Sequence, residues 1–109
     1  MPAWTKDAFF SGRLQVHQEK EGYRFSLDAV IVAASVQPKT GDLILDLGTG
    51  CGIIALLLAF QYASTHITGI EIQPRLAALA QTNALQNSLD QRITIVPGDL
   101  SKERLEAIT

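Results

Sequence analysis

The pattern of apolar and polar residues predicts a β-hairpin near the start of the chain. Leu14 and Val16 alternate with polar neighbours, residues 19–22 have the composition of a turn, and residues 23–25 resume the alternation. A period of two residues is typical of half-buried strands, so we expect strands on both sides of that turn. Residues 1–12 show no clean period, and we interpret them as a partly ordered arm.

A longer period follows the hairpin pattern and predicts an amphipathic helix. Ser26 is a residue type that caps helix N-termini, and Pro38 lies beyond the expected end. One face of this helix carries the apolar residues Leu27, Val30, Ile31 and Ala34.

Strands and helices alternate in the rest of the chain. Strands are predicted at residues 43–47, 67–72 and 93–96, and helices at residues 53–62, from Pro74 onward and at 101–108. The second of these helices has a face of small residues, Ala77, Ala80 and Ala84, that can pack closely on a sheet. This order implies right-handed crossovers and a parallel sheet.

The predicted fold class is therefore α/β, with a Rossmann-like parallel sheet of about three strands. Residues 1–39 form the arm, hairpin and first helix, and residues 40–109 form the sheet domain. Because doubly wound domains usually contain about five to seven strands, we expect this domain to be incomplete.

A glycine-rich loop connects the first strand of the sheet to its helix. The run from Asp46 to Gly52 reads Asp-Leu-Gly-Thr-Gly-Cys-Gly, and Glu71 ends the next strand. Three glycines allow a sharp turn and let a ligand approach bare backbone at a helix N-terminus. An acid about 20 residues after such a loop reaches ribose hydroxyls in nucleotide-binding folds. The loop and Glu71 therefore predict a nucleotide-type site.

The acids favour S-adenosyl-L-methionine (SAM) over a dinucleotide. The loop has the spacing G-x-G-x-G instead of G-x-G-x-x-G, and Asp46 would repel a phosphate. SAM has no phosphate and carries a sulfonium and an ammonium group. At about 4 to 6 Å and an effective dielectric constant near 20, one such charge pair contributes at most a few kcal/mol. The chain has no phosphate-binding G-x-x-x-x-G-K-[ST] sequence either.

Composition narrows the function classes further. The chain is 47% hydrophobic and 18% charged with a net charge of −2, so collagen-like, low-complexity and basic nucleic-acid-binding classes are not supported. Cys51 has no second cysteine to pair with, and no leader opens the chain, which predicts a cytoplasmic protein.

The sequence favours neither a membrane span nor a metal site. The longest apolar stretch, residues 53–60, is shorter than the roughly 20 residues of a membrane span. His17 and His66 have no second ligand at metal spacing, so no metal is expected.

The same residues resemble a known family. The run from Asp46 to Gly52 resembles motif I of class I SAM-dependent methyltransferases, residues 69–72 resemble their ribose-binding strand end, and residues 98–100 resemble their adenine-binding turn. Residues 12–15 and 22–29 resemble the N-terminal region of bacterial tRNA adenine-N6-methyltransferases, which modify adenine 37 of a valine tRNA.

The resemblance implies a role for each matching residue. Asp46 and the backbone of the loop, including Gly48, Thr49, Gly50 and Gly52, would hold the methionine end of SAM. Glu71 would bind the ribose hydroxyls and Ile72 one face of the adenine. Asp99 would accept the adenine amino group, and the N–H of Leu100 would approach a ring nitrogen. The helix start at Ser26 to Asp28 would cover the cofactor from the N-terminal side.

The chain also departs from the family pattern. Amino-methyltransferases of this group carry an Asn/Asp-Pro-Pro-aromatic tetrad after a fourth strand, which orients the exocyclic amine, and this chain has neither. We therefore predict no catalytic residue here, cofactor binding without turnover, and self-association through an exposed strand edge. The full-length protein would act on tRNA.

Structural and functional alternatives remain at this stage. Asp46 could bond the loop N–H groups, Glu71 could be an exposed strand-end residue, and Asp99 could belong to an ordinary turn. Asp28 is explained equally by the helix dipole. The alternative functions are a nucleotide-dependent oxidoreductase, a non-catalytic binding module, and methyl transfer to protein glutamine or a small molecule.

Overall fold

The computed structural model describes residues 4–21, 25 and 27–99 of the chain. In chain order the elements are β1 (Trp4–Phe9), β2 (Leu14–Glu19), α1 (Leu27–Ser35), β3 (Leu43–Leu47), α2 (Ile53–Gln61), β4 (His66–Glu71), α3 (Pro74–Gln86) and β5 (Ile93–Pro97). Strands β1 and β2 form an antiparallel hairpin, and β3, β4 and β5 form a parallel sheet in that order. The predicted α/β class, with three parallel strands and an N-terminal hairpin, is confirmed.

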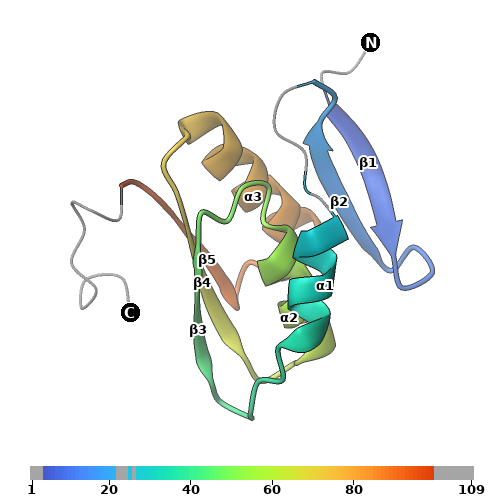
Figure 1. The fold of residues 1–109 in the computed structure, drawn as a ribbon, viewed down its shortest axis with the longest axis vertical. Coiled ribbons are helices and arrows are strands. Elements are labelled where there is room, and N and C mark those ends of the chain that lie inside the picture. The colour runs from blue at the N-terminus through green and yellow to red at the C-terminus, as the bar shows by residue number, and fades with distance from the viewer. Residues whose placement is uncertain (1–3, 22–24, 26, 100–109) are drawn as a thin grey trace.

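The helices form a layer between the parallel sheet and the hairpin (Figure 1). Helix α2 packs against α1, α3, β2, β4 and β5, which leaves it little contact with water. Its apolar sequence fits that position, since Ile53, Leu56 and Leu58 are at most 2% exposed. The helix predicted at residues 53–62 is therefore confirmed, and it is buried.

Small side chains on α3 permit close packing at the start of α2. Ala77, Ala80 and Ala84 are all buried, as their spacing predicts. A Cβ placed on Gly52, the residue that precedes α2, would lie 3.4 Å from the Cβ of Ala80. The glycine loop and α3 are therefore in direct contact.

The hairpin contains the predicted strand at Leu14 but not the predicted partner. Strand β2 pairs with β1, from Trp4 opposite Glu19 to Phe9 opposite Leu14, in the segment that we interpreted as an arm. The pattern of β1 is hard to detect because its inner face carries the polar residues Thr5 and Asp7. The turn lies at residues 10–13, and Phe25 is outside any strand; residues 22–24 lie outside the described part of the chain.

Helix α1 buries a different face from the apolar one in its sequence. Ala33 is its only buried residue, whereas Leu27 is 71% and Ile31 is 53% exposed. Among the other elements, α1 packs mainly on α2, and the face that it buries carries Ala29, Val30 and Ala33. The predicted cap Ser26 and the predicted helix at 101–108 lie outside the described residues.

Strand β3 is at one border of the parallel sheet. Its neighbour among the described residues is β4, and Leu43 and Leu47 are 73% and 54% exposed. None of the three helices in the described part of the chain has the length and apolar character that crossing a bilayer requires.

Candidate functional site

The carboxyl ends of the three parallel strands meet at one edge of the sheet, which we call the carboxyl edge. Ligands of open α/β sheets bind at this edge. The N–H of Gly98 donates to the carbonyl of Glu71 at 2.9 Å, so the turn after β5 lies against the end of β4. An open hollow of about 210 Å³ is found here, lined by Leu47, Gly48, Ile70, Ile72, Gly98 and Asp99. The fold therefore brings together Gly48, Ile72 and Asp99, three of the predicted site residues.

Glu71 connects the end of β4 to the glycine loop. Its side chain is buried, with 6% exposure, which excludes the alternative of an exposed strand-end residue. One carboxylate oxygen accepts the N–H of Gly50 at 2.8 Å, and the other accepts the N–H of Gln73 at 3.0 Å. Each carboxylate oxygen has two acceptor directions, so these bonds leave capacity for ligand hydroxyls.

Asp46 bonds to the side chain of a loop residue, Thr49. Its carboxylate accepts the hydroxyl of Thr49 at 2.8 Å, and Thr49 is buried. The loop N–H of Gly50 donates to Glu71, whereas the structural alternative expected Asp46 to bond the loop N–H groups. The two acids thus hold the loop from two neighbouring strands.

The surroundings of Asp46 raise the pKa of its carboxyl group above the ordinary value of 3.8. Burial is the largest cause, because it disfavours the charged form. The hydrogen bond from Thr49 opposes this shift, and the negative charge of Glu71 adds to it. Two carboxylates close to one another make the carboxyl edge favourable for a cationic ligand group.

The glycine loop uses several of its own N–H groups internally. The N–H of Thr49 donates to the carbonyl of Ile70, that of Gly50 to Glu71, and that of Gly52 to the carbonyl of Thr49. A phosphate at a glycine loop is normally bound by such N–H groups. Their internal use disfavours a dinucleotide and, with it, the oxidoreductase alternative.

The structure requires glycine at these loop positions for different reasons. Gly48, Gly50 and Gly52 all have positive φ angles, of 67°, 58° and 92°. A Cβ on Gly48 would meet no atom within 4 Å, so that position opens toward the hollow, whereas Gly52 packs on Ala80.

Gly69 is a site residue to which the sequence analysis gave no role of its own. A Cβ at this position of β4 would lie 2.7 Å from the hydroxyl oxygen of Thr49. The absence of a side chain therefore lets the loop pack on the strand and places Thr49 beside Asp46. A glycine inside a strand pattern is a signal for such a close approach.

The remaining predicted residues differ in their placement. Ile72 follows β4 and is 62% exposed at the border of the hollow, and Asp99 is half-buried. Asp28 is exposed in the first turn of α1 and is not among the lining residues of the hollow. Leu100 lies outside the described residues.

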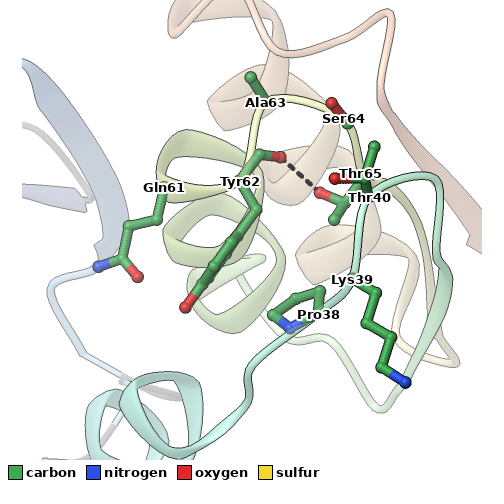
Figure 2. A pocket seen from close by; sticks show the side chains of 8 residues that line it. All are labelled: Pro38, Lys39, Thr40, Gln61, Tyr62, Ala63, Ser64 and Thr65. Carbon is green, nitrogen blue, oxygen red and sulfur yellow. Dashed lines mark hydrogen bonds between the residues drawn. The ribbon is translucent and has the colours of Figure 1, made fainter.

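A second hollow, of about 240 Å³, lies at the opposite end of the sheet, before β3 and β4 begin. Figure 2 shows its lining from the connections that precede these strands, with the hydroxyl of Thr65 donating to the carbonyl of Tyr62 at 2.8 Å. None of the predicted site residues lines it. Among the described residues, no group of three His, Cys, Asp or Glu side chains is placed to hold a metal ion.

Comparison with known proteins decides the family. Residues 44–107 match the family model described as "Methyltransferase domain". The chain belongs to this methyltransferase family. The recognition of a SAM-dependent methyltransferase from the sequence is therefore confirmed, and so is SAM as the cofactor of the family.

Two relatives make the methyltransferase resemblance more specific. A Porphyromonas gingivalis protein named tRNA1(Val) (adenine(37)-N6)-methyltransferase is 34% identical over 106 residues, which cover 94% of this chain and 42% of that protein. A protein of the same name from a Flavobacteriaceae bacterium is 33% identical over 81 residues, which cover 74% of this chain and 35% of that protein. This methyltransferase chain thus spans about two fifths of the length of these relatives.

Solved structures agree with this family. An RNA methyltransferase from Salinibacter ruber in complex with S-adenosyl-L-homocysteine (SAH) has a TM-score of 0.57 and 27% identity, and covers 70% of this chain and 47% of its own. A SAM-dependent methyltransferase from Geobacter sulfurreducens, also in complex with SAH, has a TM-score of 0.61 and 26% identity, and covers 71% of this chain and 30% of its own.

Proposed function

We propose that this chain is the SAM-binding part of a methyltransferase that, as a full-length protein, methylates adenine N6 of tRNA. The observation that carries the cofactor proposal is the hollow at the carboxyl edge. Gly48 lines it with an open glycine position, and Leu47 and Ile72, which also line it, are adjacent in sequence to Asp46 and Glu71, the two acids that hold the loop. A hollow of this kind suits a nucleoside with a cationic end.

The residues at and beside the hollow suit different parts of SAM. Glu71 has acceptor capacity left for the ribose hydroxyls, and the exposed apolar side chain of Ile72 can cover one face of the adenine. Asp99 supplies an acceptor for the adenine amino group, with the N–H of Leu100 next to it in the chain. The negative charge of Asp46 favours the sulfonium and ammonium groups. Bound SAM supplies the activated methyl group.

The choice of tRNA rests on the named relatives. The P. gingivalis protein matches 94% of this chain, whereas the family model matches residues 44–107, so that relative also matches most of the N-terminal part. The Asn/Asp-Pro-Pro-aromatic tetrad that would orient the amine is not in these 109 residues, so we assign no catalytic residue to them. A cytoplasmic location is part of this proposal, because its tRNA substrate is there.

Two measurements on the native gene product test the proposal. Calorimetric titration should show binding of SAH and no comparable binding of NAD; tighter binding of NAD would contradict the cofactor proposal. Transfer of a labelled methyl group from SAM should then occur to a valine tRNA transcript and not to the same transcript with guanine at position 37. Binding of SAH without transfer to any RNA would favour the alternative of a non-catalytic module or of another acceptor, such as protein glutamine or a small molecule.

A further inference from the structure

Two asparagines, one in α3 and one at its C-cap, cover the edge of β2 that does not pair with β1. The side-chain amide of Asn87 accepts the N–H of Gln15 at 2.9 Å and donates to the carbonyl of Gln15 at 2.7 Å. One helical turn earlier, Asn83 accepts the N–H of His17 at 2.9 Å and donates to its carbonyl at 2.8 Å. The amides therefore bond to β2 as a neighbouring strand would.

The rise per residue of α3 and of β2 explains why both amides can bond to the same strand. Four residues of a helix rise about 6 Å, and two residues of a strand rise about 6.6 Å. Asn83 and Asn87 therefore remain in step with His17 and Gln15. Arg75, eight residues before Asn83, adds an ion pair with Glu19 at 2.5 Å between α3 and β2.

Only one of the two asparagines is bonded to the glycine loop in the described structure. The amide nitrogen of Asn83 also donates to the carbonyl of Cys51 at 2.9 Å, and Asn83 is fully buried. The amide nitrogen of Asn87 donates instead to the carbonyl of Asn83 at 2.7 Å. The side chain of Asn83 thus connects α3 to two other parts of the fold, the hairpin and the loop.

The Cys51 contact lies next to the part of the loop that Glu71 holds. Gly50, which precedes Cys51, donates its N–H to the Glu71 carboxylate at 2.8 Å. A continuous set of hydrogen-bonded groups therefore extends from His17 through Asn83 and the loop to Glu71.

We propose that Asn83 is a positioning residue that holds the glycine loop in its cofactor-binding shape and couples it to the docked hairpin. This inference rests on the proposed SAM site. Without the amide donor, the buried carbonyl of Cys51 and the half-buried carbonyl of His17 lose a hydrogen bond that fixes their orientation. Coupling between two sites is reciprocal, so a bound cofactor also stabilises the bonds between Asn83 and His17.

The test compares two matched variants of the native gene product. Asn83→Asp and Asn87→Asp both keep the side-chain shape and the acceptor oxygen, and both remove the donor nitrogen. We expect the dissociation constant for SAH to rise about tenfold or more in Asn83→Asp. In Asn87→Asp, which disturbs the hairpin without touching the loop, it should stay within about twofold of the wild type.

Three results distinguish a failure of the proposed SAM site from a failure of the positioning role of Asn83. If the wild-type protein does not bind SAH, the proposed function fails before any variant is made. If a folded Asn83→Asp variant binds SAH as the wild type does, the positioning role is wrong. Equal weakening by both variants would also overturn it, since hairpin docking alone would then explain the effect.

Hydrogen exchange keeps the inference testable if Asn83→Asp does not fold. In the wild-type protein, saturating SAH should slow exchange of the His17 amide, which bonds to Asn83, more than that of the Gln15 amide, which bonds to Asn87. The same change at both amides, or no change at either, would contradict the coupling.

Discussion

The carboxylate of Glu71 accepts the backbone N–H of Gly50 at 2.8 Å, across 21 positions of the chain. This bond connects the end of β4 to the loop that follows β3. The residue that we expect to bind the ribose is therefore also the residue that shapes the loop. Its two functions are tested together in the first prediction.

We predict that Glu71→Gln weakens SAH binding about tenfold or more and lowers the free energy of unfolding by about 1–3 kcal/mol. Glutamine keeps the length of the side chain, but its NH₂ group would face the N–H of Gly50 or of Gln73. Calorimetric titration and urea unfolding of the native gene product measure the two effects.

Asp42→Asn is the matched control for Glu71→Gln. The Asp42 carboxylate also accepts a backbone N–H, that of Lys39 at 2.7 Å, in the exposed connection before β3. This control should leave the affinity for SAH unchanged. Equal losses of affinity in both variants would contradict a specific role of Glu71 in the cofactor site.

A second prediction compares two glycines with the same backbone requirement. Gly48 and Gly41 have φ angles of 67° and 84°, and a Cβ on either would meet no atom within 4 Å. Each substitution by alanine should therefore lower stability by roughly 1–2 kcal/mol through backbone strain. Only Gly48→Ala, at the hollow, should weaken SAH binding; unchanged affinity in that variant would place the cofactor elsewhere.

A third prediction concerns the pH dependence that Asp46 contributes. Its pKa is raised in the folded state, mainly by burial, so the unfolded chain releases this proton at a lower pH. The stabilising contribution is complete below the ordinary value of 3.8 and is lost as the pH rises through the higher folded-state pKa. Relative to the wild type, Asp46→Asn should therefore be more stable at pH 7 than at pH 4.

Urea unfolding of both proteins at the two pH values measures this difference. The opposite sign would show that hydrogen bonding to Thr49 outweighs burial at Asp46. Binding of SAM should strengthen over the same range, because the charged carboxylate attracts the sulfonium. In Asp46→Asn this rise in affinity should be absent.

A fourth prediction concerns the 109 residues expressed alone. Leu43 and Leu47 are exposed on β3, whose one partner among the described strands is β4. Open apolar edges of this kind pair with further chains. Sedimentation should show self-association that Leu43→Lys reduces. Lys6→Leu, which makes the reverse exchange of a charged for an apolar residue on the hairpin, serves as the control. A monomeric wild-type chain would contradict the prediction.

The local parts of this protein were predictable from its sequence. Strand β3, the glycine loop and helix α2 follow from short-range periods and glycine spacing, and these determine backbone shape within a few residues. The same local signal placed Glu71 at the end of β4. The candidate cofactor site was accessible from the sequence for this reason.

Only the tertiary structure decided which side chains hold these parts together. Asn83 bonds to His17 across 66 positions, and Arg92 donates to the carbonyl of Ala59, near the end of α2, across 33. No local period records such pairs, since packing of the whole chain creates them. For the same reason the buried face of α1 differs from its prediction, because it depends on packing against α2, about 25 positions later. The partner of β2 was missed for another reason: β1 is close in sequence, but the polar residues Thr5 and Asp7 on its inner face hide the strand pattern.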